Sequence, residues 1–298
     1  MKSLALPLAH SSHDHGRHAH AARRKSEHQG AVQHKATYEQ VKLGEEPLAI
    51  RVQGGLYAVV IRTPGEEIAH AAGFALAEGI VRRPGDLERI VHCDVEASDV
   101  VSLTLTAQRH AQIAGLLLRH GGLTGSGACG QDGIREVLKG GAASDDVATI
   151  PASGIAGCVR SLCEHQSARR AARTSHACAL YDAELRLLAL GEDVGRHNAV
   201  DKAVGQLFLR NELSRALVML VSSRISYELV VKAARARIPI VLALSHPTAS
   251  AVELGAKLNM TLATIREDAY VSVYRGGHRI RGARSAARRP DRHPSHDK

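Results

Sequence analysis

Residues 192–202, with the sequence EDVGRHNAVDK, combine carboxylates, a guanidinium, an imidazole and an ammonium in one short segment. After Gly195 the apolar residues recur at spacings of three and four, which predicts that a strand ends, the chain turns and a helix begins. The first N–H groups of a helix lack partners within it, so such a start is suited to binding an anion. The side chains available for this chemistry are Glu192, Asp193, Arg196, His197, Asp201 and Lys202.

The same spacing also fits a solvent-exposed helix start without a ligand. His197 and Asp201 are four residues apart, so they lie on one face of the predicted helix and can form a stabilising pair. The density of charge does not separate the two interpretations, and both stay open at this point.

A second polar group follows the continuous apolar run at residues 216–221. It precedes a predicted helix at 227–236 and consists of Ser222, Ser223 and Arg224. Hydroxyls, a guanidinium and helix-start N–H groups at the carboxyl end of a buried strand are suited to holding a phosphate. Serines that only cap the helix explain the hydroxyls equally well.

One cysteine lies in a segment that cannot form regular structure. Residues 121–133 include six glycines, and Cys129 lies among them. A thiol on such a loop can act as a nucleophile, but a glycine-rich connection that happens to contain a cysteine has the same sequence. The remaining cysteines do not match the spacing of a zinc site and are predicted to be small buried or half-buried side chains; they are Cys93, Cys158, Cys163 and Cys178.

Two predicted units position these groups. Residues 37–140 indicate a smaller α+β unit, with a hairpin around Gly54–Gly55, and residues 141–274 indicate an α/β unit. Because apolar strands alternate with helices in the second unit, we expect a largely parallel sheet there. The predicted helices are 66–81, 108–119, 152–172, 199–209, 227–236 and 250–258, and the predicted strands lie at 47–52, 56–63, 88–94, 100–106, 177–191 (two), 216–221, 238–244, 260–265 and 270–274.

Charge and composition exclude some functional classes. The chain has a formal net charge of +9, but residues 1–36 have six Lys or Arg against two Asp or Glu, and residues 275–298 have eight against two. The basic character therefore belongs to two tails that are predicted to be disordered, and the part between them is close to neutral. With no Trp and two Phe, the chain lacks an aromatic platform for bases, so no nucleic acid partner is expected.

The N-terminal tail has seven histidines but no fixed geometry, so we expect adventitious metal binding and predict no functional metal site. The chain has no run of eighteen apolar residues and no apolar core in its first residues. Neither a membrane span nor a secretory signal is therefore predicted. An odd number of cysteines without a framework spacing indicates reduced thiols in a cytoplasmic protein.

Four motifs together resemble the FdhD family of formate dehydrogenase accessory sulfurtransferases. They are TGSGACG at 124–130, HACALYD at 176–182, EDVGRHNAVDK at 192–202 and SSRISYELVVKA at 222–233. The resemblance extends from about residue 45 to residue 274 and includes EEPLAI at 45–50 and GFALAEGI at 73–80. It leaves out only the two tails.

The resemblance implies a cytidine-deaminase-like α/β fold, a homodimer and a cytoplasmic role. Family members accept sulfur from a cysteine desulfurase as a persulfide and pass it to bis-molybdopterin guanine dinucleotide, which then enters the formate dehydrogenase catalytic subunit. The two pyrophosphates of that cofactor fit the helix starts described above. The resemblance also implies cofactor contacts in a further segment, with Ile265, Arg266 and Tyr270.

The sequence departs from the family pattern at two places. The family loop carries two cysteines as C-x-x-C, and the ungapped match places Ser126 at the first and Cys129 at the second. A serine hydroxyl cannot hold a persulfide, so Cys129 must carry the sulfur alone. A shifted match, with Asp132 at the second position, also leaves one thiol. Members usually have a glycine and a basic residue where this chain has Glu267 and Asp268.

A cofactor chaperone and a zinc-dependent deaminase are the other two candidate functions. A cofactor chaperone without persulfide chemistry would also bind the guanine dinucleotide cofactor, and Ser126 is compatible with it. A zinc-dependent deaminase would need an H-x-E motif followed by P-C-x-x-C, which the chain lacks. Sulfur transfer is the expected function, and the chaperone is the alternative.

Overall fold

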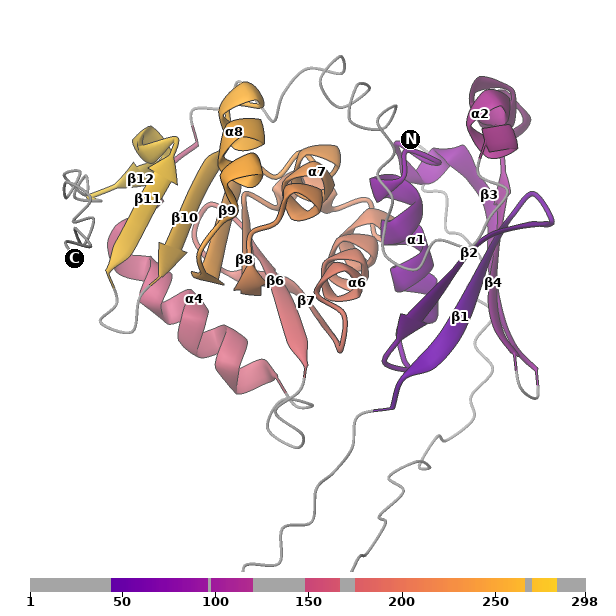
Figure 1. The fold of residues 1–298 in the computed structure, drawn as a ribbon, viewed down its shortest axis with the longest axis horizontal. Coiled ribbons are helices and arrows are strands. Elements are labelled where there is room, and N and C mark those ends of the chain that lie inside the picture. Colours follow the sequence, from indigo (N-terminus) through magenta and orange to yellow (C-terminus); the bar gives the residue numbers. More distant parts are fainter. Residues whose placement is uncertain (1–43, 96–97, 120–147, 167–174, 266–269, 283–298) are drawn as a thin grey trace, which may run out of the picture. The chain divides into compact units, whose positions relative to one another are not determined.

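A computed structural model describes residues 44–95, 98–119, 148–166, 175–265 and 270–282. Its strands form a four-stranded sheet, a six-stranded sheet and a two-stranded pair, and helices cover both faces of the six-stranded sheet (Figure 1). These ranges therefore have the mixed α/β composition that the sequence predicts. No helix within them is long and apolar enough to cross a lipid bilayer.

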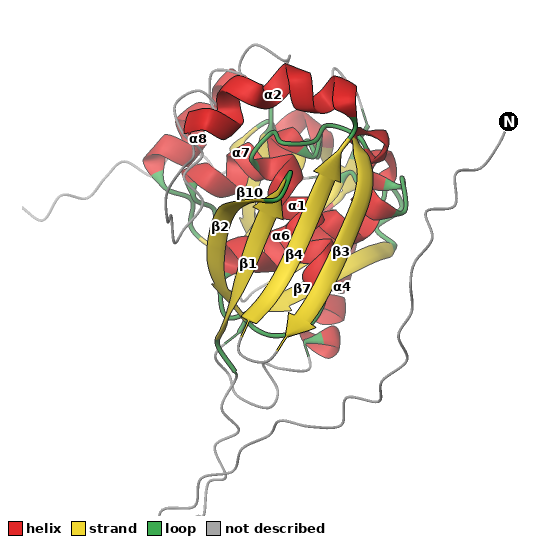
Figure 2. Cartoon of the chain, turned by 90° about the vertical axis from the view of Figure 1, so that its right-hand side faces the viewer, coloured by secondary structure: helices red, strands yellow, loops and turns green. Residues whose placement is uncertain are grey.

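The four-stranded sheet comes first in the chain, and its strands are β1 (Glu46–Val52), β2 (Gly55–Arg62), β3 (Leu87–Val95) and β4 (Ser98–Leu105). β1 and β2 form the predicted hairpin, whose turn includes Gly54 with a φ of 80°. β3 and β4 form a second antiparallel pair, and β4 runs parallel to β1. In Figure 2, α1 (Glu67–Ala77) lies behind this sheet, and α2 (Ala107–Arg119) follows β4.

The six-stranded sheet consists of β6 (His176–Tyr181), β7 (Leu187–Asp193), β8 (Val218–Arg224), β9 (Ile240–Ser245), β10 (Thr261–Ile265) and β11 (Val271–Arg275). Its order is β11-β10-β9-β8-β6-β7. The prediction of a largely parallel sheet is correct only for β8, β9 and β10, because β6, β7 and β11 pair antiparallel. Parallel neighbours need a long crossover, and the connections at 182–186 and 266–270 are too short for one.

Helices on the two faces of this sheet are α4 (Ala152–His165), α6 (Arg196–Leu209), α7 (Tyr227–Arg235) and α8 (Ala249–Lys257). α4 covers one face, and the other three helices cover the opposite face (Figure 1). Side chains alternate along β6 accordingly, since Ala179 joins the α4 core and Leu180 joins the other. α4 ends at His165, whereas the sequence predicted a helix to residue 172; residues 167–174 lie outside the described ranges.

α1 and α6 cross with their backbones in direct contact. A Cβ atom added to Gly73 would lie 1.9 Å from the backbone oxygen of Asp201, and one added to Gly205 would lie 1.7 Å from that of Ala69. The opposite side of α6 is equally close to β7, where a Cβ on Gly191 would lie 2.2 Å from the backbone oxygen of Ala199. Only glycine fits at these three positions, so α6 is held tightly between α1 and β7.

The described chain continues past β11 into a segment that the sequence analysis assigned to the basic tail. A short 3-10 helix at Gly277–Arg279 leads to β12 (Ile280–Arg281), which pairs parallel with β5 (Ile150–Pro151). Arg279 is buried and donates to the backbone oxygen of Asn259 (2.9 Å), and Ile280 joins the core under α4. The remaining short helices are Pro84–Asp86 and Leu213–Arg215.

Candidate functional site

The six-stranded sheet brings several distant segments to one edge. β8, β9 and β10 end there because they run parallel, and β7 ends there because two successive antiparallel pairings return it to the direction of β8. α6, α7 and α8 each begin just beyond these strand ends. This region is called the carboxyl edge below and comprises residues 192–197, 222–228, 245–249 and Ile265.

Three helix starts at one edge create a region suited to anions. The unpaired N–H groups of a first helical turn have a partial positive charge, which stabilises phosphates and carboxylates nearby. α6 begins without a side-chain cap at Gly195, and α7 begins without one at Ser226, whereas Thr248 caps α8 by accepting from the N–H of Ala251. The segments that the sequence analysis singled out at 192–197 and 222–224 therefore lie together at the carboxyl edge.

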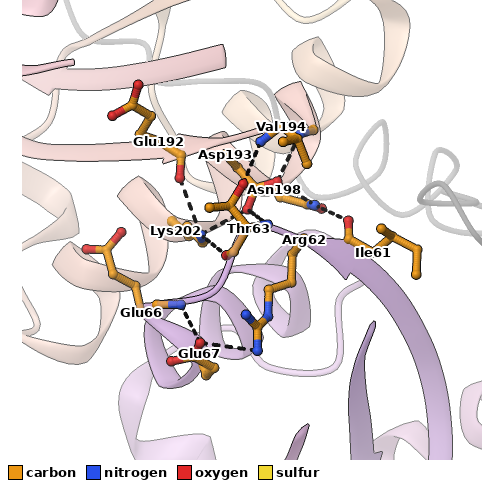
Figure 3. Close-up of polar contacts among 12 residues, drawn as sticks. Ile61, Arg62, Thr63, Glu66, Glu67, Glu192, Asp193, Val194, Asn198 and Lys202 are labelled. Carbon is orange, nitrogen blue, oxygen red and sulfur yellow. Dashed lines mark hydrogen bonds and ion pairs between the residues drawn. The ribbon is translucent and has the colours of Figure 1, made fainter. Parts of the chain in front are cut away.

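Asp193 is completely buried; its carboxylate accepts three hydrogen bonds and forms one ion pair (Figure 3). Its Oδ1 accepts from the backbone N–H of Gly195 (2.8 Å) and from the side-chain amide of Asn198 (2.9 Å). Its Oδ2 accepts from the backbone N–H of Thr63 (3.0 Å) and lies 2.9 Å from the ammonium of Lys202. The carboxylate is therefore committed to contacts within the protein.

The ammonium of Lys202 is also buried and fully used. Besides Asp193, it donates to the backbone oxygens of Thr63 (2.8 Å) and Glu192 (3.3 Å). These contacts join the end of β7 and the second turn of α6 to the chain just after β2 (Figure 3). The Glu192 side chain is separate from this group and accepts from the hydroxyl of Ser175 (2.5 Å).

Asp201 pairs with Lys232 of α7 rather than with His197, which corrects the i,i+4 pair considered from the sequence. The ammonium of Lys232 donates to both carboxylate oxygens, at 2.7 and 2.8 Å. Burial raises the pKa of Asp201, and the Lys232 ammonium opposes that rise. The nearby imidazole of His70 on α1 is completely buried, and burial lowers its pKa, as do the cations of Lys202 and Lys232.

Arg196 and His197 lie in the first turn of α6, and both are partly exposed. His197 Nε2 lies 4.0 Å from a carboxylate oxygen of Glu228, at the start of α7. Burial lowers the pKa of His197 to about 4, and the cations of Lys232 and Arg196 act in the same direction. His197 is therefore a neutral imidazole at neutral pH, with one hydrogen-bond donor and one acceptor on its ring.

The three polar residues at the end of β8 have different roles. Ser222 Oγ accepts from the backbone N–H of Ala177 (2.9 Å), and Ser223 Oγ donates to the backbone oxygen of Arg224 (3.1 Å). Both hydroxyls therefore make contacts within the protein. The Arg224 side chain is exposed and has no hydrogen bond or ion pair among the described residues.

The predicted site is thus divided into buried and accessible members. Asp193, Asp201 and Lys202 bind other protein groups, whereas Arg196, His197 and Arg224 reach solvent. In the last predicted segment, Ile265 is buried in the α4 core and Tyr270 is 66% exposed. Whether any of these residues binds a ligand stays a prediction. Ser126, Cys129 and Arg266 lie outside the described residues.

The described cysteines fall into two groups. Cys158 and Cys178 are buried; burial raises the pKa of Cys158 to about 11 and also raises that of Cys178, so both thiols stay protonated and unreactive. Cys93 and Cys163 are exposed, which corrects the prediction for them. Cys93 lies on an edge strand and Cys163 on an outer position of α4, where spacing alone does not decide exposure.

The sequence did not reveal which residues from distant parts of the chain contact the predicted site residues. Thr63 and Lys232 supply contacts to Asp193 and Asp201 from other elements, and Glu228 faces His197 from α7. Thr63 lies 130 positions from Asp193, and no local pattern marks that contact. For Lys232 a signal existed, because it lies among apolar residues on the buried face of a predicted helix.

Comparisons with known proteins agree with this architecture. Residues 43–281 match the model of the FdhD/NarQ family. The chain belongs to the FdhD/NarQ family. That match covers nearly all of the described residues, including the carboxyl edge and β12.

Curated FdhD relatives match over most of their length. A protein of Bordetella petrii named sulfur carrier protein FdhD is 34% identical over 85% of this chain and 91% of its own. A protein of the same name from Streptomyces avermitilis is 36% identical over 84% of this chain and 92% of its own. The crystal structure of a putative formate dehydrogenase accessory protein from Desulfotalea psychrophila has a TM-score of 0.63 at 22% identity, covering 79% of this chain and 89% of that one. This last similarity shows a shared fold.

Proposed function

We propose that this protein carries sulfur during the maturation of formate dehydrogenase, from a cysteine desulfurase to bis-molybdopterin guanine dinucleotide. The observation that carries the proposal is the match to sulfur carrier proteins of the FdhD family over nearly the whole described chain. The receiving partner is the formate dehydrogenase catalytic subunit. The proposal includes a cytidine-deaminase-like fold, a homodimer and a cytoplasmic location, as the family resemblance implies.

Cys129 is the proposed sulfur carrier. Its thiolate attacks the outer sulfur of a cysteine persulfide on the desulfurase, the S–S bond of that persulfide breaks, and the desulfurase cysteine leaves as a thiolate. The new persulfide on Cys129 keeps the oxidation state of the transferred sulfur, so this step needs no external electrons. Ser126 cannot carry the sulfur, because an oxygen cannot replace the sulfur that must later leave.

The carboxyl edge is the proposed binding region for the cofactor. Arg196 and Arg224 supply accessible positive charge, and the starts of α6 and α7 supply backbone donors, which together suit the pyrophosphates. His197 supplies a neutral imidazole. The further proposed contacts to the cofactor are Ser222, Ser223, Ile265, Arg266 and Tyr270. The proposed role of Glu192, Asp193, Asp201 and Lys202 is to position this region through their contacts within the protein.

A cofactor chaperone is the second candidate, and one observation favours it. The family loop has two cysteines, and this chain has Ser126 in place of the first. A protein that binds the cofactor at the carboxyl edge and hands it on needs no persulfide. In that case the groups of the carboxyl edge are required and the Cys129 thiol is not.

Intact-protein mass spectrometry after incubation with a cysteine desulfurase and cysteine separates the two candidates. Sulfur transfer predicts that the wild type gains about 32 Da, the mass of one sulfur atom, and that Cys129→Ala does not. Cys93→Ala and Cys163→Ala are matched controls, because they remove the exposed thiols of the described chain, and both should keep the gain. No gain in the wild type would contradict sulfur transfer and leave the chaperone.

A further inference from the structure

We infer that Thr63 is a positioning residue for ligand binding at the carboxyl edge, an inference that rests on the cofactor binding proposed above. Thr63 follows β2 directly and is half-buried, and it lies outside the four motifs that carry the family resemblance. Its polar groups are nevertheless all directed at α6 and the segment that leads into it (Figure 3).

Thr63 makes two contacts with this segment and one with Lys202 of α6. Its backbone N–H donates to Asp193 Oδ2 (3.0 Å), and its backbone oxygen accepts from the ammonium of Lys202 (2.8 Å). Its hydroxyl oxygen accepts from the backbone N–H of Val194 (3.1 Å). The first two contacts use the backbone, which any residue has, so the hydroxyl is the part of Thr63 that depends on the residue type.

The two buried partners of Thr63, Asp193 and Lys202, are occupied by contacts within the protein. Asp193 accepts two hydrogen bonds at Oδ1 and one at Oδ2, and Oδ2 also pairs with the Lys202 ammonium, which itself donates to the backbone oxygens of Thr63 and Glu192. A ligand at the carboxyl edge cannot engage these two charges without breaking buried contacts. Besides their electric field, these two groups act on a ligand through the backbone that they and Thr63 hold.

That backbone is the turn into α6. The N–H of Val194 is bound by the Thr63 hydroxyl and the N–H of Gly195 by Asp193, so the path of the turn is set by both. Arg196 and His197 follow immediately in the first turn of α6. Losing the hydroxyl leaves the Val194 N–H without its partner, and the donors and side chains of the helix start then sample more than one position.

Two substitutions and one matched control test this role. Thr63→Val keeps the β-branched shape and removes the hydroxyl, and Thr63→Ser restores a hydroxyl. Thr106→Val is the control, because the Thr106 hydroxyl also accepts from a backbone N–H at a helix start, that of Arg109 (3.3 Å). Thr106 is half-buried as well, and it lies between β4 and α2, away from the carboxyl edge. The unfolding free energy of each variant is measured by urea denaturation, so that binding is compared at known stability.

Guanosine 5′-diphosphate, which has the chemistry of one nucleotide end of the proposed cofactor, serves as the binding probe in calorimetric titrations. Thr63→Val is expected to raise its Kd about fivefold, the effect of one lost hydrogen bond, with Thr63→Ser within twofold of the wild type. Thr106→Val should leave the Kd unchanged. Hydrogen exchange of the peptide spanning residues 192–198 should become faster in Thr63→Val only.

Unchanged exchange at 192–198 in Thr63→Val would overturn the inference, as would a wild-type Kd in that variant. An equal loss of affinity in Thr106→Val would show a general effect of stability and would also overturn it. If the wild type itself does not bind the probe, the proposed nucleotide binding fails, and the exchange measurement alone decides whether Thr63 holds the turn into α6.

Discussion

The ammonium of Lys232 lies 2.7 Å from one carboxylate oxygen of Asp201 and 2.8 Å from the other, and both side chains are almost completely buried. The same ammonium lies 6.0 Å from the centre of the Phe74 ring on α1. This ion pair therefore joins α6 to α7 at the place where α1 packs against both. Removing one partner leaves a buried charge uncompensated, whereas removing both does not.

Lys232→Met is expected to lower the free energy of unfolding by about 3–5 kcal/mol, because it leaves the buried Asp201 carboxylate without a charged partner. The double variant Lys232→Met, Asp201→Asn should lose less than the sum of the single losses. Arg215→Met, at the exposed pair with Glu212, is the control and should lose at most about 1 kcal/mol. Urea denaturation is measured for the wild type, for Lys232→Met and Asp201→Asn alone and together, and for Arg215→Met; additive losses would contradict direct coupling of the two residues.

Gly73→Ala is expected to destabilise the protein, because the new Cβ would lie 1.9 Å from the backbone oxygen of Asp201. The helices would have to separate, and the loss should be about 3 kcal/mol or more. Gly115→Ala in α2 is the control, since nothing lies within 4 Å of its added Cβ, and it should stabilise by about 0.5–1 kcal/mol. Thermal denaturation that finds both variants equally stable would contradict the close crossing.

The free energy of unfolding is expected to fall as pH is lowered from about 6.5 to about 4. Burial lowers the pKa of His197 from 6.5 to about 4, so the unfolded chain binds a proton in this range and the folded chain does not. The stability is fully present above the unfolded pKa and declines below it, by at most about 3 kcal/mol for this residue. Burial lowers the pKa of His70 as well, which adds a loss of the same sign.

His197→Gln tests this dependence, because the variant cannot titrate. Its unfolding free energy, measured by denaturant titration at several pH values, should fall less steeply over the same range, and the remaining slope reflects the other groups with shifted pKa values, among them His70 and Asp201. His278→Gln removes an exposed histidine and is the matched control. A wild-type slope in His197→Gln would show that His197 does not remain neutral in the folded protein.

Arg224→Ala is expected to weaken binding of guanosine 5′-diphosphate about tenfold and to make binding less dependent on salt, because one accessible charge at the carboxyl edge is lost. Its unfolding free energy should change little, since the side chain makes no hydrogen bond or ion pair among the described residues. Arg51→Ala, at an exposed position on β1, is the control for total charge. If the Kd for guanosine 5′-diphosphate depends equally on salt in the wild type and in Arg224→Ala, the phosphates do not bind beside Arg224.

Local patterns predicted most elements of the described chain. The helix expected at 227–236 is α7, and the strand expected at 238–244 is β9, each within two residues at either end. The helix start after Gly195 is also as predicted. These elements follow from periodicity and from glycine and serine at their ends, which act over a few residues. The sequence also placed Ser222–Arg224 correctly at the end of a strand.

Contacts between distant residues were beyond such reasoning. One of the two interpretations left open by the sequence paired Asp201 with His197, but the crossing of α6 and α7 places Lys232 against Asp201. Gly73 and Gly205 lie inside helices, where glycine is unfavourable, and only the three-dimensional crossing explains them. β12 was assigned to a tail because two residues show no periodicity, and its pairing with β5 depends on a strand from far earlier in the chain.

The contact of α1 with α6 through glycines has a consequence for how the protein unfolds. α1 packs on the four-stranded sheet and α6 on the six-stranded sheet, and the buried side chains from both sheets form one continuous core. Neither helix can slide or tilt on the other without a backbone clash. The two sheets should therefore lose their structure in a single cooperative transition, and neither half should persist as a stable intermediate when the other is denatured.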